Sequence, residues 1–266
     1  MKTLFKIAKP IIGVIYLDAL PGYPKHENLK KVMDNMLSDL KILQECSIDG
    51  ILIENENDSP HTIKAPPEII SSMSVIAKEA VIQAEGRTPI GVEFLLNDPE
   101  ASLAIANAAH AQFIRTDYFV DKMERPEYGG EMEINPQRLM EYRKKIKASN
   151  ILLFTDIQVK YARMLEEKTI EQSVRDARTS GSNACVISGN LTGNSPDLNE
   201  LERAHKAAEG FPLFIGSGLN HENAPELLKL ADGAIVGTSI MKDGRIDMEK
   251  TKRLMESVFK IRSTAT

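Results

Sequence analysis

Short apolar runs alternate with segments of helical periodicity along the whole chain. The runs are rich in Ile, Val, Leu and Phe, which is typical of parallel strands that are buried on both faces. We expect strands over residues 11–17, 50–54, 89–95, 113–118, 151–157, 184–188, 213–216 and 234–237. The segments between them predict helices over residues 29–46, 67–84, 99–108, 136–148, 170–179, 197–208, 224–230 and 248–262. This strict alternation predicts an α/β fold.

A closed (β/α)8 TIM barrel explains the alternation better than an open sheet does, because no strand is left over for an antiparallel edge. The 266 residues are also close to the ~250 of a typical barrel, so residues 1–266 are expected to form a single domain. A dinucleotide-binding fold is disfavoured, since no G-x-G-x-x-G follows the first predicted strand. Several predicted helices begin with Pro behind an Asn or Asp cap, as at Asp98-Pro99 and Asn135-Pro136.

Composition narrows the possible partners. A net charge of −5 and the absence of a Lys/Arg cluster argue against nucleic acid as the main partner. The two cysteines, Cys46 and Cys185, stand beside apolar residues and are expected to be free buried thiols, which favours a reducing, cytoplasmic location. The N-terminal segment lacks the apolar stretch of a signal peptide, and no run is long enough for membrane insertion.

The last two predicted strands carry the clearest functional signal. Each is an apolar run that ends in glycine and small hydroxyl residues, and the loops after strands 7 and 8 of such barrels commonly bind a phosphate through backbone N–H groups. We expect a short helical turn over residues 239–242 to contribute. The predicted phosphate-binding residues here are Gly216, Ser217, Gly218, Gly237, Thr238 and Ser239. The loop after strand 6 is expected to close over the same group with Ser188, Gly189 and Gly193. Alternatively, these glycines serve only tight turns.

Charged residues at strand ends are the candidate catalytic groups, because polar side chains are out of place there unless a site uses them. They are Glu54, Glu93, Arg115, Asp117, Asp156 and Lys160. Acids that converge on the barrel axis can acquire separated pKa values and act as general acid and base. The alternative is a structural ion pair with Arg115 or Lys160 inside the barrel.

The histidines do not indicate a metal centre, because they are scattered and form no i, i+4 pair. We therefore expect no cofactor, with one alternative: a divalent ion held by Glu54, Glu93 or Asp156 together with a substrate phosphate. Residues 120–135 form a long loop on the active face, and the paired Gly129 and Gly130 would suit a mobile lid, although a plain surface loop is equally compatible.

Taken together, several segments resemble the BtpA/SgcQ family of predicted barrel proteins. They are residues 13–22, 49–55, 91–98, 113–117, 155–160, 186–193, 216–220 and 231–238. The resemblance implies a barrel of the ribulose-phosphate-binding superfamily, similar in its phosphate loops to phosphoribosylanthranilate isomerase and to the tryptophan synthase α chain. The chain departs from the family pattern at Tyr16, Gln158 and Tyr161, where relatives often carry histidine. Asp156 falls where the isomerase has its strand-5 acid, but the isomerase's first-strand cysteine has no match.

Two functions are compatible with these observations. The first is an enzyme of isomerase or lyase type that acts on a phosphorylated sugar, nucleoside or related metabolite by carboxylate acid/base chemistry. Such an enzyme would belong to carbohydrate metabolism. The second is a non-catalytic assembly or regulatory factor of the kind named for photosystem I biogenesis, which retains a ligand-binding barrel. Homo-oligomerisation is compatible with both.

Overall fold

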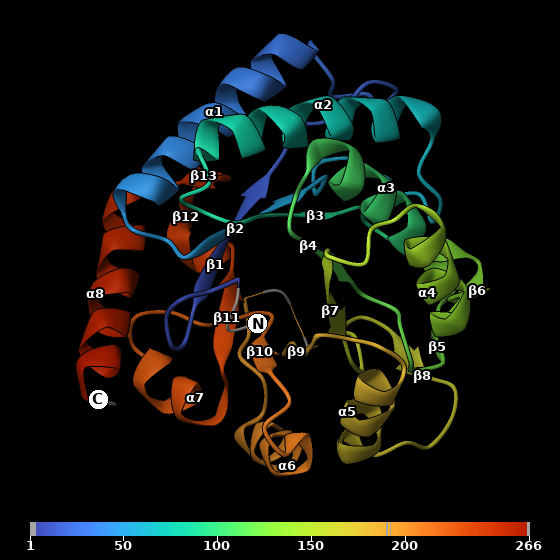
Figure 1. The fold of residues 1–266 in the computed structure, drawn as a ribbon, viewed down its shortest axis with the longest axis vertical. Coiled ribbons are helices and arrows are strands. Elements are labelled where there is room, and N and C mark those ends of the chain that lie inside the picture. The colour runs from blue at the N-terminus through green and yellow to red at the C-terminus, as the bar shows by residue number, and fades with distance from the viewer. Residues whose placement is uncertain (1–3, 190, 192, 265–266) are drawn as a thin grey trace.

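The computed structural model describes residues 4–189, 191 and 193–264. In this part of the chain, eight parallel strands close into a barrel surrounded by eight α-helices (Figure 1). The barrel strands are β1 (Ile11–Tyr16), β2 (Gly50–Glu54), β3 (Ile90–Glu93), β4 (Phe113–Thr116), β7 (Leu152–Asp156), β9 (Ala184–Ile187), β10 (Leu213–Ile215) and β11 (Gly233–Val236). The helices are α1 (Leu29–Glu45), α2 (Pro67–Ala84), α3 (Pro99–Ala109), α4 (Pro136–Lys145), α5 (Ile170–Thr179), α6 (Leu198–Ala208), α7 (Ala224–Leu230) and α8 (Met248–Thr264). The predicted TIM barrel is confirmed.

The helices begin where the sequence predicts them, because polar side chains cap their first turns. Asn28, Asp98, Asn135, Thr169 and Asp197 each accept a hydrogen bond from a backbone N–H group of the following helix. Helix α4 ends three residues before its predicted end. Lys147 has φ +57°, which takes the chain out of the helix, and the Arg143 side chain donates hydrogen bonds to the carbonyl groups of Ala148 and Ser149 that follow.

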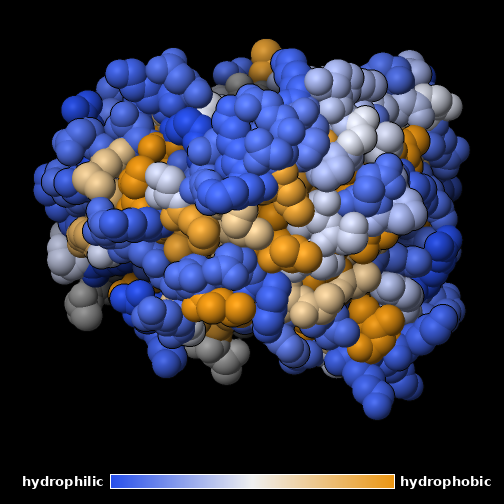
Figure 2. All heavy atoms as spheres, turned by 90° about the horizontal axis from the view of Figure 1, so that it is seen from above, coloured by the Kyte–Doolittle hydropathy of each residue, from blue (hydrophilic) through white to orange (hydrophobic). Residues whose placement is uncertain are grey.

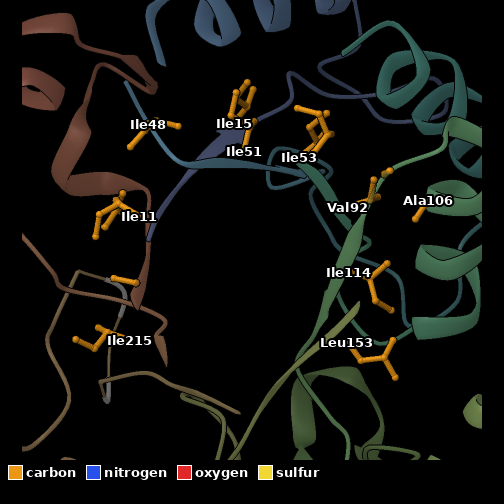
Figure 3. Packing of buried hydrophobic residues seen from close by; sticks show 14 of the residues in the cluster. Ile11, Ile15, Ile48, Ile51, Ile53, Val92, Ala106, Ile114, Leu153 and Ile215 are labelled. Carbon is orange, nitrogen blue, oxygen red and sulfur yellow. The ribbon is translucent and has the colours of Figure 1, made fainter. Parts of the chain in front are cut away.

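Two apolar layers hold the barrel together. Outward side chains of the strands pack against the helices, as the labelled Ile15, Val92, Ile114 and Leu153 do in Figure 3. Inward side chains form a second cluster inside the barrel. The period-2 alternation of a strand therefore sends one residue to each layer in turn.

Aromatic rings close the lower half of the barrel interior. The ring centroids of Phe113 and Phe154 lie 5.2 Å apart, those of Phe154 and Phe214 lie 5.0 Å apart, and Phe5 packs edge-on against this group. Gly91 provides the space, because a Cβ atom there would stand 2.1 Å from the Phe113 ring. The floor of the barrel interior is thus filled by aromatic side chains.

The predicted lid is an ordered part of the structure. Residues 123–131 form the strands β5 (Met123–Arg125) and β6 (Gly130–Glu131) around the 3-10 helix η1 (Pro126–Tyr128). Strand β5 also pairs with β8 (Arg163–Met164) from the loop after β7, which makes a three-stranded antiparallel sheet. We call it the mouth sheet. A separate apolar cluster that includes Leu96, Met123 and Met132 supports it, so this segment is not a plain loop, and its movement as a lid stays a prediction.

The predicted helical turn over residues 239–242 is wrong in its bounds. The 3-10 helix η2 covers Thr238–Ile240, and the chain then enters a hairpin of β12 (Met241–Lys242) and β13 (Arg245–Ile246). The hairpin turns at Asp243 and Gly244, both with positive φ. The buried Met241 side chain extends the core instead of continuing a helix.

The outer surface is mainly hydrophilic. Over α1 and α2, at the top of Figure 1, apolar patches are separated by polar side chains (Figure 2). Two of the apolar side chains that α2 exposes are Val75 and Ile82, each 54% exposed. None of the helices in the described residues has both the length and the apolarity to cross a bilayer.

Candidate functional site

A ring of residues at the barrel mouth continues the inward rows of the strands. Each member stands two positions after an inward apolar residue or, in β3, after the small Gly91. The ring consists of Tyr16, Glu54, Glu93, Arg115, Asp156, Ser188, Gly216 and Gly237. Seven of these residues are sequence-predicted site residues, and Tyr16 is the additional one.

A single cavity of about 190 Å³ opens above this ring. Its lining comes from three sources: polar residues at the ends of β1, β2 and β4, the loops after β9, β10 and β11, and the mouth sheet with its neighbours. The predicted residues that line it are Glu54, Arg115, Asp117, Lys160, Gly193, Gly216, Ser217, Gly218, Gly237, Thr238 and Ser239. The structure therefore brings most of the predicted site together.

Arg115 is the centre of a buried ion-pair cluster. Its Nε and Nη2 atoms donate to the two carboxylate oxygens of Asp156 at 2.8 and 2.9 Å. Its Nη1 atom lies 3.3 Å from Glu54 Oε1 and 3.6 Å from Glu93 Oε2. All four side chains are at most 9% exposed, so each charge depends on its partners. The structural ion pair considered as an alternative for these residues is present.

Three predicted residues lie behind the cavity instead of in its described lining. Asp156 has both oxygens on Arg115 and also accepts a hydrogen bond from the Ser188 hydroxyl at 3.3 Å. Glu93 is 1% exposed, and its Oε2 atom has no hydrogen-bond partner among the described residues. Burial raises the pKa of Glu93 well above its usual range, and Arg115 offsets this only in part. Burial thus favours the protonated form of Glu93 more than it would in an ordinary glutamate. Glu93, Asp156 and Ser188 thus lie outside the described cavity lining, and their predicted roles toward a ligand stay predictions.

Asp117 and Glu56 are the titratable acids of the cavity itself. Burial, followed by the negative charge of Asp156, raises the pKa of Asp117 to about 7. Burial and the neighbouring Glu54 raise the pKa of Glu56 to about 7 as well, although its exposed side chain means that solvent weakens this effect. The positive charge of Lys160 lowers both pKa values in part. Asp117 is therefore the stronger candidate for a group that exchanges a proton near neutral pH.

Glu56 was not among the predicted site residues, because it lies two positions beyond the end of the predicted strand. The signal was available: in Glu54-Asn55-Glu56 the second acid has the same parity as the first, so an extended backbone would direct both to one side. Tyr16 was noted only as a departure from a family pattern. Its ring lines the cavity, and burial together with Glu54 raises the pKa of its hydroxyl, so it is a neutral hydrogen-bonding group.

The loops predicted to bind phosphate divide into two groups. The first group holds the loops together. The Gly216 N–H donates to the Ile187 carbonyl at 2.7 Å. The Ser217 hydroxyl accepts from the Gly189 N–H at 2.9 Å and donates to the Asn194 carbonyl at 2.9 Å. Gly189 is absent from the described lining. For these residues the alternative explanation, that they shape turns, accounts for what the structure shows.

The second group remains open to the cavity. Gly193, Gly218, Gly237, Thr238 and Ser239 line it. The described residues contain no backbone–backbone hydrogen-bond acceptor for the N–H groups of Gly218, Thr238 and Ser239. Gly218 has φ +73° and lies so close to residues 194–195 that a Cβ atom would stand 2.1 Å from the Ser195 nitrogen. Three loops thus present small residues at one end of the cavity, and the loops after β10 and β11 also present unpaired backbone donors.

The opposite wall comes from the mouth sheet and from residues beside it. Arg125, Tyr128 and Tyr161 line the cavity there, next to Leu95 and the His61 ring. The sequence indicated this loop only as a lid. It could not indicate that β5 pairs with β8, which lies some forty residues further along the chain.

The described residues contain no group of three or more His, Cys, Asp or Glu side chains arranged to hold a metal ion. The acids considered for a divalent ion, Glu54, Glu93 and Asp156, lie instead around the Arg115 guanidinium. Both cysteines are free and buried, as predicted.

Solved structures with a similar fold are distant in sequence. Thiamine phosphate pyrophosphorylase from Pyrococcus furiosus superposes with a TM-score of 0.61 at 17% identity, covering 97% of this chain and 98% of that one. N-(5'-phosphoribosyl)anthranilate isomerase from the same organism gives a TM-score of 0.56 at 14% identity, covering 94% and 99%. Both names are those of phosphate-handling enzymes. At these identities the likeness establishes the fold alone.

Relatives in sequence are closer. An uncharacterised protein of Archaeoglobus fulgidus is 34% identical over 249 residues, covering 94% of this chain and 98% of the relative. The photosystem I biogenesis protein BtpA of Synechocystis is 33% identical over 246 residues, covering 91% and 84%. Residues 7–260 match the model of the BtpA family. With a match over nearly its whole length, a closed eight-stranded barrel and polar strand ends at one mouth, the chain belongs to the BtpA family.

Proposed function

We propose that this protein is an enzyme that binds a phosphorylated small molecule, of the sugar or nucleoside type, and acts on it by acid/base chemistry. One observation carries the proposal: three glycine-containing loops, two of them with open backbone donors, line the same cavity as Asp117 and Lys160. A phosphate at the loops would hold the rest of the ligand beside a group that titrates near neutral pH.

The phosphate would lie against Gly218, Thr238 and Ser239. Backbone N–H groups that lack an acceptor suit an anion, and Thr238 and Ser239 add two hydroxyl donors. The ion-pair cluster around Arg115 does not suit a phosphate, because the charge of Arg115 is already matched by Asp156 and Glu54. The anion and the acids would therefore occupy opposite ends.

Asp117 would exchange the proton, with Glu56 as its partner and Lys160 stabilising the charge that develops. We propose an isomerase or lyase reaction in carbohydrate metabolism that uses this pair without a cofactor. Arg115, Glu54, Glu93 and Asp156 would position this centre, because their charges are directed mainly at each other.

The structural neighbours support the ligand class, since thiamine phosphate pyrophosphorylase and phosphoribosylanthranilate isomerase have phosphorylated compounds in their names. A cytoplasmic location is part of the proposal, because free cysteines persist in reducing compartments.

A negative charge introduced at the loops tests the phosphate site. In calorimetry and thermal unfolding, ribose 5-phosphate and sn-glycerol 1-phosphate should bind the protein, whereas ribose and glycerol should not. Ligand at a hundred times its Kd should add about 2.7 kcal/mol to the free energy of unfolding. Ser239→Asp should remove this binding and the matched neutral variant Ser239→Asn should retain it. Equal binding by both variants would refute the site.

A non-catalytic assembly factor is the second candidate, because a relative with 33% identity has the name of a photosystem I biogenesis protein. The two candidates differ in turnover. With a bound sugar phosphate in D₂O, NMR should reveal exchange of a carbon-bound hydrogen or conversion of the ligand, and Asp117→Asn should abolish it. Binding without exchange or conversion would favour the assembly factor.

A further inference from the structure

The cavity wall opposite the phosphate loops is built from apolar and aromatic groups. Leu95, Leu96 and Val159 contribute aliphatic surface, and Tyr128 and Tyr161 contribute rings. A sugar phosphate alone would leave this wall in contact with water. Ligand sites place apolar surface where the ligand itself is apolar, so the wall indicates a second, less polar part of the ligand.

A fixed flat surface crosses this wall. The Arg125 guanidinium carbon lies 5.1 Å from the centre of the Tyr128 ring and 5.7 Å from the centre of the Tyr161 ring. Arg125 Nε donates to Glu127 at 2.5 Å and its Nη1 donates to the Tyr118 hydroxyl at 3.4 Å, which holds the stack in place. Tyr161 is 50% exposed at the mouth, so part of its ring surface faces outward.

A second phosphate is a poor match for this wall. The Arg125 charge is already paired with Glu127. Asp117, Glu54 and Glu56 line the same cavity and would repel another dianion. The group held here should therefore be uncharged.

His61 adds one specific hydrogen-bonding position. Its Nδ1 atom is buried and has no hydrogen-bond partner among the described residues. Burial, and next the charge of Arg125, lowers the pKa of the His61 imidazole, which is thus neutral at pH 7. If the ring turned this nitrogen toward the cavity, it would meet an N–H group or a ring nitrogen of a ligand, depending on the tautomer of His61.

We propose that the mouth-sheet wall binds a planar, uncharged heteroaromatic ring of nucleobase size, held by Tyr161, Tyr128 and the Arg125 stack and read by His61. This inference rests on the proposed function and narrows it: the ligand is a phosphate ester that also carries such a ring, as a nucleotide does. Stacking on aromatic side chains is tolerant of the ring's identity, so affinity comes from the stack and selectivity from His61.

Calorimetry with two ligand types tests this inference separately from the phosphate site. The probes are ribose 5-phosphate and the four common nucleoside 5'-monophosphates. Nucleotides whose base offers a hydrogen-bonding partner to His61 should bind at least about 10-fold more tightly than ribose 5-phosphate. This is the gain in affinity that one stacked base supplies. Tyr161→Leu should remove that gain and leave the affinity for ribose 5-phosphate unchanged.

Phe259→Leu is the matched control. Phe259 is also an exposed aromatic residue, 45% exposed, and it also lies 5.7 Å from an arginine guanidinium, but it is on α8 away from the cavity. This variant should bind every probe as the unaltered protein does.

The outcomes separate the two proposals. Equal affinities for ribose 5-phosphate and all four nucleotides, unaffected by Tyr161→Leu, would overturn the ring subsite and retain the phosphate site. If the unaltered protein binds none of the probes, both the ring subsite and the phosphate site are overturned. A nucleotide preference that persists in Tyr161→Leu and in His61→Ala would place the ring elsewhere and overturn the inference.

Discussion

Arg115 determines which charges can exist at the barrel mouth. Three carboxyl groups lie within 3.6 Å of its guanidinium, and all are buried. Such a cluster gains little over an apolar core as a whole, but losing one member leaves charges without partners. Arg115, a candidate catalytic group in the sequence, is in the structure the cation that Glu54, Glu93 and Asp156 share.

Arg115→Met should therefore lower the free energy of unfolding by about 3–5 kcal/mol at pH 7, because it leaves buried carboxylates unpaired. Urea unfolding measures the change. The loss should shrink toward pH 5, since the unpaired acids become protonated in the folded state and no longer carry a buried charge.

The control for this variant is Arg178→Met. Arg178 lies 3.8 Å from Glu209 in a pair whose side chains are 51% and 79% exposed. Exposed pairs contribute about 0–1 kcal/mol, so this variant should remain near the unaltered protein. Equal losses for Arg115→Met and Arg178→Met would contradict the proposed role of the cluster.

The raised pKa of Asp117 should make the free energy of unfolding depend on pH. Its pKa is about 7 in the folded protein and near 3.8 for an ordinary Asp, so folding favours its protonated form. Its contribution is complete below about pH 4 and is lost as the pH rises through about 7. Asp117→Asn stays neutral at every pH, so its stability advantage over the unaltered protein should grow between pH 4.5 and 7.5.

Urea unfolding at both pH values measures this change. Asp34→Asn, on the exposed surface of α1, is the control and should stay within about 0.5 kcal/mol throughout. If Asp117→Asn instead loses stability relative to the unaltered protein as the pH rises, the Asp117 carboxylate is stabilised by folding and cannot act as the acid.

At the scale of elements, the bounds of the barrel strands could be predicted from the sequence, whereas the conformation of the loops at the mouth could not. The predicted strand starts agree with the structure to within one residue, because period-2 alternation and buried β-branched runs are local signals. Strands β3 and β4 end two residues before the predicted ends, where the chain turns from the barrel toward the loops. The same alternation placed Glu54, Arg115 and Gly237 at the mouth.

Loop conformation was not predictable, because it depends on contacts between distant segments. The mouth sheet requires Met123 to pair with Met164, and the loop after β9 is held by Ser217 from the next strand's loop. Neither contact leaves a periodic signal in the sequence. For this reason Arg125, Tyr128 and Tyr161 were not recognised as cavity residues.

The barrel floor offers a test of packing between elements. Gly91→Ala should destabilise the protein by about 1–3 kcal/mol, because the new Cβ atom would overlap the Phe113 ring. Denaturant unfolding of the unaltered protein, Gly91→Ala, Phe113→Leu and the double variant gives a double-mutant cycle. The double variant should lose less than the sum of the single losses, since the smaller side chain makes room. Strict additivity would indicate that the two residues do not share this space.

At the scale of the whole molecule, the filled floor and the polar mouth give the barrel one open end. The cavity lies at the carboxyl ends of the strands, where barrel enzymes carry out their chemistry. Membership of the BtpA family fixes the fold and leaves the activity to the residues of the mouth. Homo-oligomerisation stays a prediction. The apolar patches over α1 and α2 in Figure 2 are one candidate interface. Light scattering on the unaltered protein and on variants at the exposed Val75 or Ile82 would test it.

The central claim is that this mouth binds a phosphate between the loops after β9, β10 and β11. Crystals soaked in tungstate, a heavy analogue of phosphate, would locate the anion directly by its anomalous scattering. We expect one anion within about 2.7–3.2 Å of donors on Gly218, Thr238 and Ser239. A mouth with no anion at concentrations that saturate binding in calorimetry, or an anion at another surface only, would contradict the claim.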